Sequence, residues 1–246
     1  MRKFGLIGKK LGHSFSKKYF TEKFEREGIA DAGYELYELP KVQGVPKLLQ
    51  QEPELVGLNV TVPYKEQVVA LLDDLDKAAA TIGAVNTIKI SDGKTKGYNT
   101  DYIGFKSTLE EFYPQQEHGQ ALVLGTGGAA KAVWAALDAL HIPYLRVSRS
   151  AAEGQVSYAQ LTPELLQAYN LIINTTPLGM YPQVQEAPEL PYKSINQRHY
   201  CYDLVYNPEQ TLFLQQCAAQ GAKAMNGIPM LRAQAEASWN IWNLEY

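Results

Sequence analysis

The middle of the chain reads Ala121-Leu122-Val123-Leu124-Gly125-Thr126-Gly127-Gly128-Ala129-Ala130. Its first four residues are apolar and predict a buried strand, and the alanine-rich stretch that continues to about Leu140 predicts a helix. The glycines between them let backbone amides approach a pyrophosphate at the N-terminus of a helix. A tight turn without a ligand can have the same composition, but the strand before it and the helix after it favour nucleotide binding.

Short apolar strands alternate with helices on both sides of this segment, as is typical of a mostly parallel sheet covered by helices. Downstream, we expect strands at 144–147, 171–174 and 200–205, and a final helix from Pro229 to Leu244. Upstream, we expect a connecting helix at 102–113, strands at 3–8, 34–39, 55–62 and 84–90, and helices at 16–27 and from about Lys65. The pattern predicts two α/β units, with the last helix free to return to the first.

The residues that follow the strand at 144–147 bear on which dinucleotide binds. NAD-binding folds usually place an Asp or Glu there for the ribose 2′-hydroxyl, whereas this chain has Ser148-Arg149-Ser150 and no acid before Glu153. A guanidinium flanked by hydroxyls suits a 2′-phosphate, because it offers charge-assisted hydrogen bonds. The alternative is a solvated surface arginine. Given the glycine loop, the sequence favours NADP.

Short polar side chains also gather near strand ends in the first half of the chain. Lys65 comes just past a strand in Asn59-Val60-Thr61-Val62-Pro63-Tyr64-Lys65, at the edge where open α/β sheets bind ligands. Ser14-Phe15-Ser16 precedes the first helix, Asn86 lies in a predicted strand, and Asp101 lies in a predicted loop. Each has a structural alternative as a helix cap, an edge strand or a turn former.

Composition excludes several classes of protein. The 246 residues carry 26 acidic and 23 basic side chains, a net charge of −3, which argues against a nucleic-acid-binding protein. No apolar run is long enough to span a membrane, and Lys9 and Lys10 interrupt the N-terminal apolar stretch too early for a secretory signal. Cys201 and Cys217 form no disulfide framework, which fits a reducing cytoplasm. Metal-like spacing is also missing at the four histidines, His13, His118, His141 and His199.

Taken in order, several segments resemble the shikimate dehydrogenase family over nearly the whole chain. They are Ser14-Phe15-Ser16, residues 59–65, Gly83-Ala84-Val85-Asn86-Thr87, Asn99-Thr100-Asp101, residues 125–129, Ile173-Asn174-Thr175-Thr176-Pro177, residues 202–208 and residues 227–235. The Asn-Val-Thr-Val-Pro-x-Lys and Asn-Thr-Asp patterns are specific to that family. The resemblance implies reversible NADPH-dependent reduction of 3-dehydroshikimate to shikimate, in the route through chorismate to aromatic amino acids.

The resemblance also implies a domain organisation. An N-terminal α/β substrate domain would comprise residues 1–101 and 226–246. A Rossmann-like, doubly wound NADP-binding domain would comprise residues 102–225, with a cleft between the two. The expected protein is a cytoplasmic monomer or homodimer that acts on a small molecule, with no nucleic-acid, membrane or metal partner.

By the same resemblance, Lys65 and Asp101 correspond to the catalytic pair. An ammonium at Lys65 can stabilise the alkoxide that forms on the substrate and supply its proton, while Asp101 would orient that ammonium. Substrate-binding positions are Ser14, Ser16, Thr61, Asn86, Asp101, Tyr206 and Gln234. Cofactor-binding positions are Gly125, Thr126, Gly127, Gly128, Ala129, Ser148, Arg149, Ser150, Leu204 and Gly227.

The chain departs from the family pattern at three places. Thr126 replaces the alanine common in the loop, and Tyr102 replaces the usual glycine after the aspartate. Ser148 replaces a frequent asparagine and no second arginine follows Arg149, so the preference for NADP could be weaker than usual. Two alternatives stay open: a quinate/shikimate dehydrogenase that uses either cofactor, and a non-catalytic regulator that senses shikimate.

Overall fold

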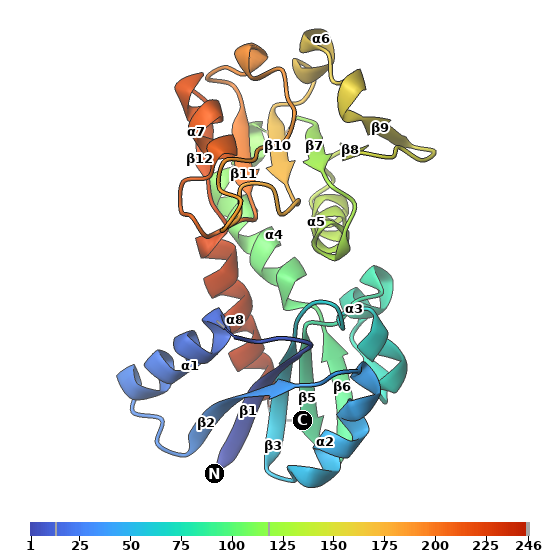
Figure 1. Cartoon of the computed structure of the whole chain (residues 1–246), viewed down its shortest axis with the longest axis vertical. Coiled ribbons are helices and arrows are strands. Elements are labelled where there is room, and N and C mark those ends of the chain that lie inside the picture. Colours follow the sequence, from blue (N-terminus) through green and yellow to red (C-terminus); the bar gives the residue numbers. More distant parts are fainter. Residues whose placement is uncertain (13, 118, 245–246) are drawn as a thin grey trace. The chain divides into compact units, whose positions relative to one another are not determined.

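The computed structural model describes residues 1–12, 14–117 and 119–244, which form two compact units (Figure 1). Unit 1 is Met1–Thr100 with Ala235–Tyr246, and unit 2 is Asp101–Gln234. Both connections between the units run through helices, α4 (Thr100–Phe112) and α8 (Ile228–Trp242). The predicted boundaries followed residues 101 and 225, whereas the contacts divide the chain after Thr100 and again inside α8.

Unit 1 is built on a six-stranded sheet of mixed direction. Its strands are β1 (Arg2–Gly8), β2 (Ala32–Glu38), β3 (Leu55–Val60), β4 (Asp74–Leu75), β5 (Thr87–Ser91) and β6 (Lys94–Tyr98), in the order β2-β1-β3-β5-β6-β4. β1 is parallel to β2 and β3, but β5 is antiparallel to β3 and β6. A two-residue turn with positive φ at both Asp92 and Gly93 joins β5 to β6, and such turns form hairpins. The predicted mostly parallel pattern therefore holds for the first three strands and for the pair of β4 and β6, but not for β5.

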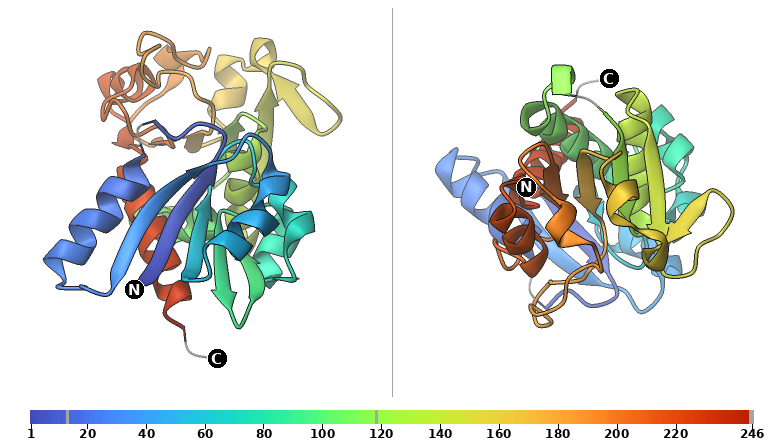
Figure 2. Two further views of the ribbon diagram at one scale, coloured as in Figure 1. Left: turned by 60° about the horizontal axis from the view of Figure 1, so that its bottom comes forward. Right: turned by 90° about the horizontal axis from the view of Figure 1, so that it is seen from above.

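Helices cover both faces of this sheet (Figure 2). Side chains alternate along β1, so Phe4 packs with α1 (Phe15–Arg26) and α8, whereas Ile7 packs with Val45 of α2 (Val45–Gln51). The same second face carries α3 (Lys77–Ile82) and the 3₁₀ turns η1 (Val42–Gly44) and η2 (Gln67–Leu71). The helix expected from about Lys65 is therefore wrong: only the short turn η2 forms, because the backbone becomes extended at Leu72 and leads into β4.

Unit 2 is a doubly wound, fully parallel sheet, as predicted. Its strands are β7 (Ala121–Leu124), β8 (Tyr144–Ser148), β9 (Gln155–Ser157), β10 (Leu171–Asn174), β11 (Tyr200–Asp203) and β12 (Lys223–Met225), in the order β12-β11-β10-β7-β8-β9. Its short 3₁₀ turns are η3 (Gln115–Glu117), η4 (Tyr158–Gln160) and η5 (Tyr192–Ser194). The chain runs outward from β7 to β9 and then returns to the other side of β7 at β10. This switch point is where open α/β sheets bind their ligands.

Two apolar layers sandwich the sheet of unit 2. On one face, Ala121 and Val123 pack with α4, α5 (Gly128–Ala139) and the first turn of α8. On the other, Leu122 and Leu124 pack with α6 (Pro163–Leu166) and α7 (Leu212–Ala219). All four strand residues are completely buried, which fixes the end of β7 and the glycine loop that follows it. Among the described residues, no helix is long and apolar enough to cross a membrane.

Candidate active site

The glycine loop leaves β7 at the switch point and opens α5. Gly125 adopts a φ of +103°, which favours glycine, and an added Cβ would lie 2.8 Å from the Thr175 hydroxyl oxygen. Thr175 directly follows β10 and is bound to the end of β7: both its backbone amide and its hydroxyl donate to the carbonyl of Leu124, at 2.9 and 2.7 Å. The loop is thus held between the carboxyl ends of β7 and β10.

Gly127 differs from Gly125, because packing does not require a glycine there. It caps the N-terminus of α5 with an ordinary extended backbone, and an added Cβ would meet no atom within 4 Å. The amides of Gly128 and Ala129 begin the first turn of the helix, where the dipole favours an anion. Thr126 lies between the two glycines. This open cradle at a helix N-terminus fits a pyrophosphate.

A positively charged residue follows the carboxyl end of β8, at the same edge of the unit 2 sheet as the glycine loop. Ser148 ends the strand, its hydroxyl accepts the amide of Ser150 at 3.3 Å, and Arg149 between them is exposed. Burial raises the pKa of the Tyr158 hydroxyl, and the charge of Arg149 opposes that rise, which places the guanidinium near Tyr158. The loop and this tip together fit an NADP molecule.

Two further cofactor positions come together by backbone packing. The amide of Gly227 donates to the carbonyl of Val205 at 3.0 Å, and an added Cβ at Gly227 would lie 2.2 Å from the Leu204 carbonyl oxygen. Glycine is therefore required at 227 by the fold, and it brings Leu204 and Gly227 side by side. Tyr206, two residues after Leu204, is 39% exposed.

Gln234 is the last residue of unit 2 and lies in α8. Its side chain is largely buried, and its amide donates to the carbonyl of Leu231 in the same helix at 2.9 Å. Gly104 of α4 packs directly on this part of α8, since an added Cβ would come within 2.8 Å of the Gln234 amide nitrogen. The glycine lets the two connecting helices approach closely and fixes the backbone of Gln234.

Hydrogen bonds to the Asp203 side chain hold together β10, β11 and α7. Asp203, at the end of β11, accepts hydrogen bonds from Asn174 of β10 at 2.9 Å, from the Val205 amide at 3.0 Å and from Thr211, the N-cap of α7, at 2.5 Å. The aspartate is completely buried. Burial raises its pKa from 3.8 to about 6, although these three donors oppose the rise.

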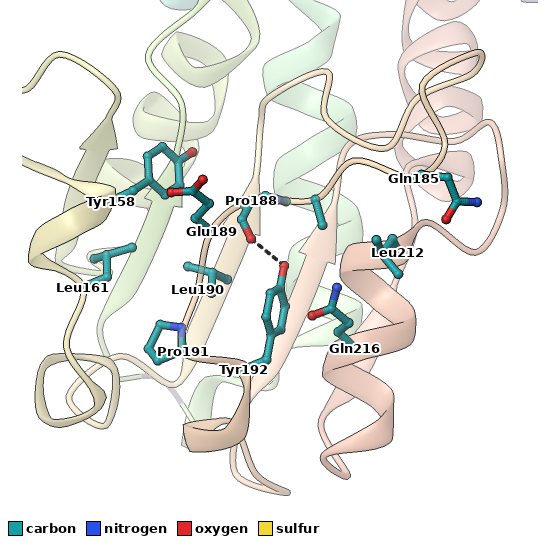
Figure 3. Close-up of a pocket in the computed structure, with 11 residues that line it drawn as sticks. Tyr158, Leu161, Gln185, Pro188, Glu189, Leu190, Pro191, Tyr192, Leu212 and Gln216 are labelled. Atoms are coloured by element: carbon teal, nitrogen blue, oxygen red, sulfur yellow. Dashed lines mark hydrogen bonds between the residues drawn. The ribbon is translucent and has the colours of Figure 1, made fainter.

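A cavity of about 550 Å³ lies over the face of the sheet that packs with α6 and α7, and Figure 3 draws the side chains that line it. Tyr158, the segment 185–192 and α7 line it, and the Tyr192 hydroxyl donates to the Pro188 carbonyl at 2.8 Å. None of the predicted site residues is among the described side chains that line it. The cavity belongs to the layer over this face of the sheet, and we assign it no part in the site.

In unit 1, the two serines stand at the start of α1. Ser14 is the N-cap, and its hydroxyl oxygen accepts the Lys17 amide at 3.3 Å, so the structural alternative is correct for Ser14. Its hydroxyl proton is still free to be donated to a ligand. Ser16 lies in the first turn, near the hydroxyl of buried Tyr34, whose pKa is raised by burial. Charged contacts hold α1 on α8, where buried Lys23 pairs with Glu236 at 2.9 Å.

Thr61 and Lys65 follow the end of β3. The Thr61 amide donates to the carbonyl of Ile7 in β1 at 3.0 Å, and its methyl group packs over Gly8. Lys65 lies in the turn before η2, and its carbonyl accepts the Val85 amide at 2.8 Å. Through this bond, the turn that carries Lys65 is tied to the residue directly before Asn86.

Asn86 binds Thr100, the residue before Asp101, at the N-terminus of α4. Asn86 precedes β5 instead of lying within it, and its Oδ1 accepts the Thr100 amide at 2.6 Å and the Thr100 hydroxyl at 3.1 Å. The prediction that Asp101 lies in a loop is wrong, because Asp101 lies in the first turn of α4. An acid there is stabilised by the helix dipole. Unit 1 thus contains Ser14, Ser16, Thr61, Lys65 and Asn86, while Asp101 begins unit 2.

Sequence reasoning missed the buried polar residues behind this site. Asn59 donates to Thr87 at 3.1 Å and to Ser238 of α8 at 3.0 Å, and it accepts the Tyr34 hydroxyl at 2.7 Å. Asn59 was visible in the strand pattern, but its burial was not. Thr100 was visible only as part of the Asn99-Thr100-Asp101 pattern, and Ser238 gave no signal, because a single hydroxyl in a helix is usually a surface residue.

Among the described residues, no three His, Cys, Asp or Glu side chains are grouped as metal ligands would be. His141 lies in an exposed turn with positive φ, and burial lowers the pKa of His199. His13 and His118 lie outside the described residues.

Comparisons with known proteins identify the family of the chain. Residues 6–88 match the model of the shikimate dehydrogenase substrate binding domain. The shikimate dehydrogenase (NADP(+)) of Clostridium perfringens is 38% identical over 99% of this chain and 93% of its own length. The Thermus thermophilus shikimate 5-dehydrogenase, solved with NADP(H) and shikimate, has a TM-score of 0.87 and 30% identity over 99% of this chain and 94% of its own.

A quinate dehydrogenase also has this fold. The enzyme of Corynebacterium glutamicum, solved in complex with NAD, has a TM-score of 0.88 at 25% identity, covering 98% of this chain and 93% of its own. Its identity to this chain is well below that of the NADP-dependent relative from Clostridium perfringens. By this likeness over almost its full length, the chain belongs to the shikimate dehydrogenase family.

Proposed function

We propose that this chain catalyses the reversible, NADP-dependent oxidation of shikimate to 3-dehydroshikimate, an oxidoreductase step in the biosynthesis of chorismate and the aromatic amino acids. The observation that carries the proposal is that the turn of Lys65 and the start of the helix of Asp101 are tied to two consecutive residues, Val85 and Asn86. The Val85 amide holds the Lys65 carbonyl, and Asn86 itself holds the Thr100 amide next to Asp101. A chain that kept the fold only to sense a ligand would have no need of the lysine and aspartate in these fixed places.

Unit 2 supplies the residues for NADP. Gly127, Gly128 and Ala129 would hold the pyrophosphate, with Gly125 and Thr126 shaping the loop, and Arg149 between Ser148 and Ser150 would hold the 2′-phosphate. Leu204 and Gly227 form the remaining contact positions. When bound, the nicotinamide of NADP accepts or returns the hydride.

Unit 1 supplies most of the residues for the substrate. Ser14 and Ser16 would donate hydroxyl hydrogen bonds to the substrate carboxylate near the positive end of α1. Thr61 and Asn86 would bind hydroxyls, with Tyr206 and Gln234 of unit 2 completing the set. Oxygen atoms dominate this set, as a polyhydroxylated acid requires.

Lys65 and Asp101 would transfer the proton to and from the reacting oxygen of the substrate. In the direction of reduction, negative charge builds on the carbonyl oxygen, and the Lys65 ammonium stabilises that charge and gives up a proton to it. Asp101 would orient the ammonium and accept a hydrogen bond from a neighbouring hydroxyl of the substrate.

Quinate oxidation with NAD is the second candidate, favoured by the likeness to the quinate dehydrogenase. Two features speak for shikimate and NADP: the paired serines at the start of α1, and Arg149 at a strand end without an acid. The domain assignment is part of the proposal, with unit 1 for shikimate and unit 2 for NADP. A cytoplasmic location, supported by the two free cysteines, and a monomeric or homodimeric state complete it.

The test is the rate of cofactor reduction, followed by absorbance, with each substrate, shikimate or quinate, and each cofactor, NADP⁺ or NAD⁺. We expect the highest kcat/KM for shikimate with NADP⁺. Lys65→Ala should lower kcat by about 10²–10⁴-fold, the range for loss of a general acid, while the exposed Lys47→Ala serves as the matched control. A Lys65→Ala enzyme with normal turnover would refute the mechanism, and a preference for quinate and NAD⁺ would refute the assignment.

A further inference from the structure

We infer that Ser238 of α8 is a positioning residue that sets the orientation of the Asn86 amide and the start of α4 for substrate binding. The inference rests on the proposed function and deepens it. Ser238 is completely buried. Its hydroxyl oxygen lies 3.0 Å from Asn59 Nδ2, 2.8 Å from Thr87 Oγ1 and 3.1 Å from Thr100 Oγ1. Three elements, β3, β5 and α4, therefore meet on one side chain of α8.

The hydrogen bonds in this cluster have a common donor-to-acceptor direction, from Asn59 toward Asn86. The NH₂ group of Asn59 can only donate, and it lies within hydrogen-bond distance of Thr87 Oγ1, Ser238 Oγ and the backbone carbonyl of Asn86. Each hydroxyl carries a single proton. Thr87 and Thr100 both lie within hydrogen-bond distance of Asn86 Oδ1, at 3.3 and 3.1 Å, and Thr100 also donates its backbone amide there at 2.6 Å. The chain of donors begins at Asn59, passes through Ser238, and ends on the Asn86 oxygen.

This direction fixes which end of the Asn86 amide faces a ligand. If the amide were reversed, its NH₂ group would face the Thr100 amide, a donor against a donor at 2.6 Å. The oxygen is therefore held by the cluster, and Nδ2 is the group left to act outside it. A donor suits the oxygen of a substrate hydroxyl. Asn86 is buried, so a wrong orientation would leave polar groups unpaired at a high cost.

Ser238 acts on this arrangement without touching the substrate itself. Its hydroxyl oxygen accepts a hydrogen bond from the Asn59 NH₂ group, and its single proton can be donated to one of the two threonine hydroxyls, which themselves donate to Asn86 Oδ1. Without that hydroxyl, Asn59 loses an acceptor and the threonines lose a donor. Thr100 is then held less firmly against Asn86, and Asp101 follows Thr100 directly in the first turn of α4. Both substrate contacts should loosen together.

The test compares Ser238→Ala with Thr108→Val as the matched control. Thr108 also carries a buried hydroxyl, bonded to Tyr202 at 2.6 Å in unit 2. Ser238→Ala should lower kcat/KM for shikimate about five- to thirtyfold, the effect expected for one buried hydrogen bond, with KM for NADP⁺ within about twofold of normal. Thr108→Val should lower Tm by about as much as Ser238→Ala does, because each removes one buried hydroxyl, but it should leave the shikimate kinetics unchanged. A Ser238→Ala enzyme that loses only Tm would overturn the inference.

A double mutant tests the route through Thr100. Thr100→Val removes the hydroxyl but keeps the backbone amide, so it should reproduce much of the effect even if Ser238→Ala does not fold. The double variant should lose little more than the larger single loss, because the two hydroxyls act in one chain. Losses that multiply would show that Ser238 acts independently, which contradicts the inference.

A measurement without substrate separates this inference from the proposed function. In the ligand-free protein, hydrogen exchange of the Thr100 amide, followed by NMR, should be about five- to thirtyfold faster in Ser238→Ala and unchanged in Thr108→Val. Faster exchange in a protein that does not oxidise shikimate would leave the positioning intact and remove the proposed function. Unchanged exchange at Thr100 would remove the positioning, whatever the activity.

Discussion

At the scale of the residue, Arg149 is the side chain on which the choice between NADP and NAD depends. It is exposed between two serines, and no second arginine follows it in the sequence. A charge-assisted hydrogen bond to a phosphate contributes roughly 1.5–3 kcal/mol, or about ten- to a hundredfold in affinity. Arg149→Ala should raise KM for NADP⁺ by that factor and leave KM for NAD⁺ nearly unchanged. The exposed Arg198→Ala in the same unit is the control, and equal losses for both cofactors would mean that Arg149 only shapes the loop.

Single residues also show where sequence reasoning stops. Lys65, Asn86 and Asp101 could be predicted as a group from their order in the chain, and the backbone bonds that tie them together could not. Ser238 was invisible, because its role arises from an approach of α8 to β3 and β5 that is distant in sequence. Ser14 caps α1 through its hydroxyl oxygen, which leaves its proton for the substrate contact that we propose.

At the scale of the element, buried Asp203 connects β10, β11 and α7, and its ionisation makes its contribution to folding stability depend on pH. Its pKa is about 6 in the folded protein and 3.8 unfolded, so between pH 4 and 6 the folded state binds more protons. Stability from this group therefore rises as the pH falls through that range, by about 3 kcal/mol in total. Asp203→Asn keeps a donor for Thr211 and an acceptor for the Val205 amide.

Asp203→Asn should remove this contribution, so the difference in unfolding free energy between variant and native protein should change between pH 4.5 and pH 7. Urea denaturation at the two pH values measures it. Asp73→Asn is the control, because hydrogen bonds from Thr95 lower the pKa of exposed Asp73, and its effect should have the opposite sign. A parallel pH profile for native protein and Asp203→Asn would contradict the prediction.

Elements could be predicted where the apolar pattern was long enough. The strands at 121–124 and 171–174 agree with β7 and β10 to the residue. The shortest strands, β4, β9 and β12, were missed, since two or three residues carry no periodicity. β6 was missed because its residues are mostly polar, although the Asp92-Gly93 turn before it was visible.

At the scale of the whole molecule, the return of the last helix to the first unit could be predicted, and its point of return could not. The fifteen residues of α8 form one continuous helix. Its beginning packs with unit 2 through Met230, while Ala235 and Trp242 pack with Phe4 in unit 1. A sequence pattern marks where a helix starts, but the change of packing partner inside a helix depends on the folded structure.

The assignment of shikimate to unit 1 and NADP to unit 2 predicts a divided pattern of ligand protection. NADP⁺ alone should slow hydrogen exchange at 125–130 and 148–150, and shikimate alone should slow it at 14–16, 61–65 and 86–87. At a ligand concentration of about one hundred times Kd, binding adds roughly 2.7 kcal/mol, so exchange through opening of the bound segments should slow by up to about a hundredfold. Hydrogen exchange with mass spectrometry measures both patterns, and NAD⁺ at the same concentration controls for the 2′-phosphate. Protection of residues 14–16 by NADP⁺ alone would contradict the assignment, because these residues belong to the unit that carries no part of the glycine loop or of the tip of β8.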